Sequence, residues 1–181
     1  MTPKALILDR DGTLIEHVPY LSNPKDIRLL PGVEEGLRLA LDSGAKLFLH
    51  TNQSGVGRGY FDIEAVDRCN NRLFEILGEN VPFQAVCSAP EAPGMPSKYR
   101  KPSPRFAREV MNEYSFRPDE VCYVGDRGSD IATAEAAGTR AVGVATGLDD
   151  LRSEIGALKL LQKYPVFTDF LSAMKFLFPK L

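Results

Sequence analysis

The chain has 181 residues, of which 44% are hydrophobic and 25% charged, and its formal net charge is −2. This length suits one domain over residues 1–181, and the acidic balance disfavours a nucleic-acid partner. No apolar run approaches the roughly 18 residues of a membrane span, so no membrane partner is expected. The N-terminus does not resemble a secretory signal, which makes a cytoplasmic protein our expectation.

Strand and helix patterns alternate along the chain. Short apolar runs are typical of buried strands, and between them apolar residues recur at helical spacing. In the first half of the chain, we expect strands at 5–8, 46–50 and 83–87, with a helix at 33–41 and a helix at 63–77 capped by Asp62 between them. A long proline-rich loop at 88–104 follows, and then a helix at 103–114 with Ser103 as N-cap, a strand at 121–124 and a helix from 129 that ends at Gly138. We expect the last strands at 141–144 and around Val166, and a helical tail at 167–178 that covers the sheet edge.

This alternation predicts an α/β fold, a doubly wound, Rossmann-like parallel sheet with helices on both faces. Ligands of such sheets bind at the carboxyl ends of the strands. Asp9, Thr51 and Asp126 each follow a predicted strand. We therefore expect these three residues to lie together in one binding site at that edge of the sheet.

Carboxylates gather at two of these strand ends. Asp9 and Asp11 flank a single arginine, while Asp126 and Asp130 lie four residues apart at the start of a helix. Converging carboxylates repel unless a cation lies between them, and oxygen ligands suit Mg²⁺ better than zinc. Since Mg²⁺ also favours phosphate oxygens, the acidic residues point to phosphate chemistry.

Groups that bind anions occur in two further segments. Thr51 and Asn52 lead into a glycine-rich turn that contains Arg58, and Arg100 and Lys101 directly precede a proline. Hydroxyl, amide and guanidinium donors hold phosphate oxygens, and lysine neutralises a phosphoryl group as a point charge. Each motif alone is typical of a turn or a solvated corner. Together, in this order, they favour a catalytic site.

The segments "LDRDGTL", "HTNQSG", "RKPSP" and "VGDRGSD" resemble the four motifs of the haloacid dehalogenase (HAD) superfamily of phosphatases, over about residues 4–147. "TNQSGVGRG" followed by "RKPSP" is similar to the branch that holds D-glycero-D-manno-heptose 1,7-bisphosphate and histidinol-phosphate phosphatases. The resemblance implies a HAD-like fold. The intervals between motifs leave no room for a large cap domain, so loops 14–26, 53–60 and 88–100 would supply specificity.

The resemblance also implies roles in catalysis. Asp9 would be the nucleophile, and Asp11 would protonate the leaving oxygen and then deprotonate water, with its backbone carbonyl on Mg²⁺. Asp126 would bind Mg²⁺ directly, and Asp130 would be a ligand or lie beside one. Lys101 would neutralise the phosphoryl group and tether the nucleophile.

The remaining roles concern the substrate. Thr51 would bind phosphoryl oxygens with Asn52 beside it, and Arg127 stands where these enzymes often carry lysine. Arg58 and Arg100 suit a second phosphate. We expect Mg²⁺-dependent hydrolysis of a small phosphorylated sugar, preferably removal of the 7-phosphate of heptose 1,7-bisphosphate. The alternatives are histidinol phosphate, another small metabolite, a nucleic-acid 3′-phosphate, and a catalytically silent phosphosugar-binding protein.

Several residues depart from the resemblance or carry weaker predictions. Many members of the branch hold zinc before the RKP motif, but here only Cys87 remains and Ala89 replaces the histidine, so we expect no zinc. We predict a surface or packing role for His17, with contact to the substrate as the alternative, and a supporting role for His50. Strand alternation predicts that Arg10 points away from both acids, in packing or a salt bridge. A monomer or weak homodimer is expected.

Overall fold

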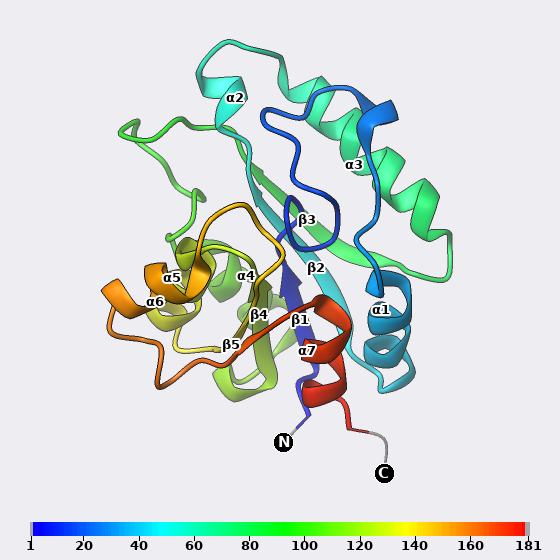
Figure 1. Ribbon diagram of the computed structural model, residues 1–181, viewed down its shortest axis with the longest axis vertical. Coiled ribbons are helices and arrows are strands. Elements are labelled where there is room, and N and C mark those ends of the chain that lie inside the picture. The colour runs from blue at the N-terminus through cyan, green and yellow to red at the C-terminus, as the bar shows by residue number, and fades with distance from the viewer. Residues whose placement is uncertain (1, 180–181) are drawn as a thin grey trace.

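A computed structural model describes residues 2–179, and these form a six-stranded parallel sheet in the order β3-β2-β1-β4-β5-β6 (Figure 1). All pairs in this order are parallel, and β1 pairs with both β2 and β4. The strands are β1 (Ala5–Leu8), β2 (Lys46–Asn52), β3 (Phe83–Ala89), β4 (Val121–Gly125), β5 (Arg140–Val144) and β6 (Val166–Phe167). The predicted α/β fold class is confirmed.

Helices cover both faces of the sheet (Figure 1). They are α1 (Val33–Asp42), α2 (Ser54–Gly57), α3 (Ile63–Leu77), α4 (Arg105–Tyr114), α5 (Gly128–Ala137), α6 (Leu151–Ala157) and α7 (Phe170–Leu177), with 3₁₀ turns at Pro24–Asp26 and Pro118–Glu120. Among the described residues, no helix is both long and apolar enough to cross a membrane.

Strand β1 shows how the two faces are built. Leu6 and Leu8 pack into one core with side chains of α1, α3 and α7. Ala5 and Ile7 pack into a second core with side chains of α4, α5 and α6. Side chains alternate between faces along a strand, so a strand with helices on both sides must be apolar at every position. All four residues of β1 are fully buried, which fixes the strand end that carries Asp9.

Several predicted boundaries hold, and others shift. Asp62 caps α3 by accepting a hydrogen bond from the Ala65 amide, and Gly138 ends α5 in the left-handed conformation, both as predicted. Ser103 is not the N-cap of α4: Pro104 takes that position, without a side-chain cap. The predicted loop begins later than residue 88, because β3 extends to Ala89.

Two further segments differ near the strand ends. Strand β2 runs to Asn52, so Thr51 and Asn52 are its last residues rather than the start of a turn. The glycine-rich turn after them contains the short helix α2. The tail forms α7 as predicted, but this helix packs on α1 against one face of the sheet. Helix α6 was not predicted.

Candidate active site

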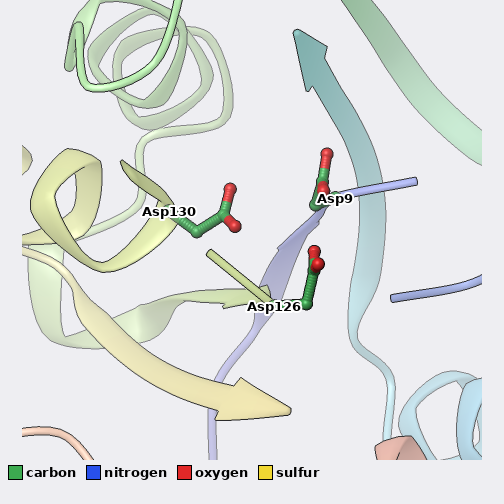
Figure 2. Close-up of side chains that lie close together, drawn as sticks. All are labelled: Asp9, Asp126 and Asp130. Atoms are coloured by element: carbon green, nitrogen blue, oxygen red, sulfur yellow. The ribbon is translucent and has the colours of Figure 1, made fainter. Parts of the chain in front are cut away.

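Three aspartates meet at the carboxyl end of the sheet (Figure 2). Asp9 follows β1 and Asp126 follows the neighbouring strand β4, while Asp130 lies in the first turn of α5. Each is buried, and one carboxylate oxygen from each lies within 4.8 Å of the other two. Parallel strands side by side bring their ends together, which is why residues 117 positions apart in sequence, Asp9 and Asp126, share this cluster. We call these three residues the acidic cluster.

The carboxylates of the acidic cluster are unfavourably placed as anions. Burial, followed by the charges of Asp9 and Asp130, raises the pKa of Asp126 to about 9. Burial also raises the pKa of Asp130 to about 6, although the nearby Lys101 ammonium opposes the shift. The cluster therefore holds a proton at neutral pH unless another cation takes its place.

The surroundings of Asp126 fit a metal ion. Its Oδ1 atom accepts a hydrogen bond from Thr13 Oγ1 at 3.1 Å, but its buried Oδ2 atom receives none from the described residues. A Cβ atom at Gly12 or at Gly147 would overlap Oδ2, so both glycines allow the Asp126 carboxylate to lie against the backbone in this position. Three carboxylates that converge, one of them with an unpartnered buried oxygen, suit a hard cation, and Mg²⁺ fits the donors present.

Lys101 supplies a positive charge directly beside the acidic cluster. Its Nζ atom lies 2.7 Å from Asp9 Oδ1 and 2.6 Å from Asp130 Oδ1, and the side chain is buried. Burial alone lowers the pKa of Lys101, but the carboxylates of Asp130 and Asp9 outweigh burial and raise it. The lysine therefore stays charged, in contact with Asp9 as the resemblance implied.

Asp11 lies outside the acidic cluster, and its carboxylate is held by three neighbours. Arg10 places Nη2 3.0 Å and Nε 3.2 Å from Asp11 Oδ2. Gln53 Nε2 donates to the same oxygen at 2.8 Å, and Thr51 Oγ1 lies 3.4 Å from it. Asn70 Oδ1 accepts from Arg10 Nη1 at 2.8 Å. These contacts fix the orientation of Asp11.

The prediction that Arg10 points away from both acids is wrong, although the predicted salt bridge is present. Strand β1 ends at Leu8, and the amides of Leu14 and Ile15 donate to the Arg10 carbonyl in a tight turn. Alternation of side chains does not apply in such a turn. Arg10 is fully buried, and its guanidinium forks onto Asp11.

The side chain of Asn52 binds the backbone of Lys101. Asn52 Oδ1 accepts from the Lys101 amide at 2.9 Å, and Asn52 Nδ2 donates to the Lys101 carbonyl at 3.2 Å. The structure thus brings Asn52 into the site as a partner of the lysine segment. Gln53, which touches both Thr51 and Asp11, was missed in the sequence because nothing distinguishes it within a glycine-rich turn.

The site opens into a hollow with two adjoining lobes. The catalytic lobe has a volume of about 250 Å³ and is lined by Asp9, Asp11, His17, Thr51, Asn52, Ser54, Arg100, Lys101, Asp126, Arg127 and Ser129. The outer lobe has a volume of about 390 Å³ and is lined by Asp11, His17, Val18, Pro19, Tyr20, Leu21, Asn52, Gln53, Ser54, Gly55, Phe61 and Arg127. Five residues line both lobes and so lie at their junction: Asp11, His17, Asn52, Ser54 and Arg127.

The predicted anion-binding arginines divide into two groups. Arg100 and Arg127 line the catalytic lobe, and Arg127 also pairs with Asp149 and, at 3.6 Å, with Glu154. Arg58 is exposed and lines neither lobe. The structure thus brings two of the three arginines to the hollow.

His17 lines both lobes, and its Nδ1 atom is buried without a hydrogen-bond partner among the described residues. This placement suits contact with the substrate, the alternative to the surface or packing role. Of the three predicted specificity loops, 14–26 supplies the largest share of the outer lobe and 53–60 also lines it, whereas 88–100 supplies only Arg100, in the catalytic lobe.

Comparisons with known proteins agree with this site. A family model described as HAD-hydrolase-like matches residues 98–172. The chain is 32% identical over 163 residues to the D-glycero-D-manno-heptose-1,7-bisphosphate 7-phosphatase of Thermosynechococcus vestitus, covering 83% of each chain. It is 33% identical over 132 residues to the D-glycero-beta-D-manno-heptose-1,7-bisphosphate 7-phosphatase of Helicobacter pylori, covering 72% of this chain and 76% of that one.

A solved structure shares nearly the whole fold. The D,D-heptose 1,7-bisphosphate phosphatase of B. bronchiseptica, crystallised with magnesium and phosphate, superposes with a TM-score of 0.86 at 27% identity. The match covers 96% of this chain and 97% of that one. With the sequence relatives and the four motifs, it shows that the chain belongs to the haloacid dehalogenase superfamily of phosphatases, in the branch of the heptose bisphosphate phosphatases.

Proposed function

We propose that this protein is a Mg²⁺-dependent phosphomonoester hydrolase that acts on a small phosphorylated sugar, with D-glycero-D-manno-heptose 1,7-bisphosphate as the preferred substrate and its 7-phosphate as the group removed. The observation that carries this proposal is the position of Asp11. Its side chain lies where the catalytic and outer lobes meet, while Asp9, Lys101 and Asp126 line only the catalytic lobe.

The two lobes divide the substrate between them. A phosphoryl group in the catalytic lobe would face the Asp9 carboxylate, with the Thr51 hydroxyl and the Lys101 ammonium as donors to its oxygens. The sugar would extend into the outer lobe. The ester oxygen, which links the two parts, would then lie at the junction beside Asp11. An acid at that place can protonate the leaving group.

The reaction proceeds in two displacements. An Asp9 oxygen attacks phosphorus and the bond to the ester oxygen breaks, while Asp11 gives its proton to the departing alcohol. Asp11 then takes a proton from water, whose oxygen attacks phosphorus and releases phosphate from Asp9. Arg10 and Gln53 hold Asp11 in one orientation. Each proton that Asp11 gives up is thus recovered in the second displacement.

Mg²⁺ would be held by Asp9 and Asp126, with the Asp11 carbonyl as a further ligand and Asp130 as a ligand or neighbour, and when bound it supplies charge neutralisation at the phosphoryl oxygens. The chain's own residues prepare that place. Gly12 and Gly147 leave room for the Asp126 carboxylate, whose Oδ2 atom receives no hydrogen bond from the described residues. Mg²⁺ dependence is therefore part of the proposal.

The identity of the substrate rests on the relatives and on the hollow. The relatives named above are heptose bisphosphate 7-phosphatases. Arg100 and Arg127 offer cationic contacts besides Lys101, which suits a substrate with a second phosphate. An open hollow formed by loops also suits a small sugar rather than a polymer. We further propose a single catalytic domain, no bound zinc, and a monomer or weak homodimer.

A panel of phosphorylated metabolites tests the proposal. Phosphate release is measured with Mg²⁺ for heptose 1,7-bisphosphate in both anomeric forms, other sugar phosphates, histidinol phosphate and a 3′-phosphorylated oligonucleotide. We expect the largest kcat/KM for the heptose bisphosphate. Preference for histidinol phosphate would move the chain to that activity. Tight sugar-phosphate binding without turnover would instead support a silent binding protein.

A further inference from the structure

Lys101 depends on a loop for its position. The acidic cluster comes from strand ends and a helix, whereas Lys101 lies between β3 and α4 in a segment without helix or strand. Its Nζ atom must still lie 2.7 Å from Asp9 Oδ1. Contacts along the loop backbone must therefore hold the lysine in place.

Two alternate residues of β2 make these contacts. Asn52 binds both the amide and the carbonyl of Lys101. Two residues earlier in β2, the His50 Nε2 atom lies 2.8 Å from the carbonyl oxygen of Tyr99. A carbonyl oxygen can only accept a hydrogen bond, so Nε2 must carry the hydrogen. Side chains of strand β2 thus hold the loop by hydrogen bonds to its backbone at Tyr99 and at Lys101.

His50 is itself fixed from the other side. Its Nδ1 atom lies 3.0 Å from the hydroxyl of Tyr123, which is a β4 residue and 1% exposed. With Nε2 protonated, neutral His50 accepts at Nδ1, so Tyr123 is the donor. Phe106 packs against the ring edge-on, with ring centroids 5.1 Å apart. The imidazole is fully buried and has one geometry available.

The charge state of His50 agrees with this hydrogen-bond chain. Burial, followed by the nearby charge of Lys101, lowers the pKa of His50 to about 3, although the hydrogen bond to Tyr99 opposes the shift. The ring is therefore neutral at physiological pH, with one donor and one acceptor. The contacts with Tyr99 and Tyr123 use both.

We propose that His50 is a positioning residue for Lys101: its ring links the Tyr123 hydroxyl to the Tyr99 carbonyl and so sets the path of the loop that delivers the lysine to Asp9. The role rests on the proposed function for its effect on turnover, but the hydrogen-bond chain itself is a property of the fold. Leucine at position 50 would fill similar space without either hydrogen bond. The loop would then be held near Lys101 by Asn52 without the second contact.

The test is a double-mutant cycle with Lys101. We expect His50→Leu to lower kcat about 10- to 100-fold with a smaller change in KM, because the lysine acts mainly on the transition state. In a Lys101→Met background the same change should lower kcat by no more than about twofold, because its target is gone. His50→Gln, which keeps a donor and an acceptor, should recover part of the lost activity.

Phe48→Leu is the matched control. Phe48 is buried in the same strand and lies two residues before His50, so it points to the same face, but it packs in the apolar core. Activity per folded molecule should stay within about twofold of the unchanged protein, although stability falls by the cost of a large-to-small change. A loss of kcat equal to that of His50→Leu would mean that general loosening of β2 explains both.

Hydrogen exchange provides a readout that does not need turnover. The Lys101 amide, which donates to Asn52, should exchange at least about tenfold faster in His50→Leu, while the amides of β1 keep their protection. Unchanged exchange at Lys101 would overturn the positioning role even if no substrate is found. If His50→Leu fails to fold, Tyr123→Phe removes one of the two bonds and should show the same pattern with a smaller amplitude.

The outcomes separate the two proposals. If the unchanged protein hydrolyses no phosphate ester but the exchange result holds, the proposed function fails and the positioning role stands. If the protein is active and the kcat loss of His50→Leu persists undiminished in the Lys101→Met background, the proposed function stands and the positioning role is wrong.

Discussion

The acidic cluster and the outer lobe are built in different ways, although they share one hollow. The cluster comes from the ends of two buried strands and the first turn of a helix, and all three carboxylates are buried. The largest share of the outer lobe comes from residues 17–21, where Pro19 and Tyr20 are exposed. Rigid elements thus hold the groups that would react, and a loop meets the part of the substrate that varies.

Asp9→Asn, a change in the acidic cluster, should have the largest effect on turnover. An amide is a poor nucleophile, so turnover should fall by at least about 10⁴-fold on every phosphate ester. Phosphate release under saturating substrate and Mg²⁺ measures the loss, and circular dichroism verifies the fold. Full activity in this variant would exclude Asp9 as the phosphoryl acceptor.

Asp126→Asn should separate activity from stability. We expect turnover to fall about 10²- to 10³-fold. Because the folded-state pKa of Asp126 is raised from 3.8 to about 9, the metal-free native state binds a proton that the unfolded state releases. Binding of this proton adds to the free energy of unfolding. The contribution is fully present below pH 3.8 and is lost as the pH rises toward 9.

Thermal unfolding with a chelator over about pH 5 to pH 8 measures this effect. The Tm of the unchanged protein should fall with pH more steeply than that of Asp126→Asn, and Mg²⁺ should raise the former alone. Equal slopes for the two proteins would contradict the burial of an unfavourable carboxylate at this position.

Asn70→Ala tests the support behind Asp11. Asn70 accepts from the buried Arg10 guanidinium, and its own amide donates to Ser88 Oγ at 3.2 Å. Without it, Arg10 loses a partner and Asp11 loses a fixed neighbour, so kcat should fall about 5- to 10-fold. The fall should vanish in an Asp11→Asn background. A loss of the same size in both backgrounds would show that Asn70 acts elsewhere.

His17→Ala tests the loop side. Removal of a side chain that lines the outer lobe should raise KM for the preferred sugar phosphate about 3- to 10-fold and leave kcat on a small aryl phosphate nearly unchanged. Glu16→Ala is the matched control, since Glu16 is exposed and lines neither lobe. An equal loss on both substrates would place His17 with the reacting groups instead.

Metal analysis tests the smallest effect. We expect less than about 0.1 zinc per chain after purification without added metal, because a structural zinc site needs four ligands and residues 87–100 contain one cysteine, Cys87, and no histidine. Cys87→Ser should then leave the Tm unchanged within error. Stoichiometric zinc that is lost in Cys87→Ser would overturn this prediction.

The acidic cluster could be predicted well from the sequence, whereas the turns and loops around it could not. Asp9 and Asp126 follow short apolar runs, and parallel strands leave little choice about where such residues meet. Arg10 was misplaced because the alternation of a strand was applied to residues 9–11, which lie beyond the end of β1 in a turn. Gln53 and Gly147 lack any local signal, since their roles arise from contacts with residues far away in the chain.

Gly147 offers a way to disturb the proposed metal site by the addition of a single methyl group. Unlike Gly12, it does not have a positive φ, so alanine there brings no backbone strain and only its Cβ intrudes on Asp126 Oδ2. Gly147→Ala would keep every charged residue of the site but would force the Asp126 carboxylate out of its present position. Such a variant would separate the position of a charge from its presence, because turnover would report on where the Asp126 carboxylate lies while the net charge of the site stays the same.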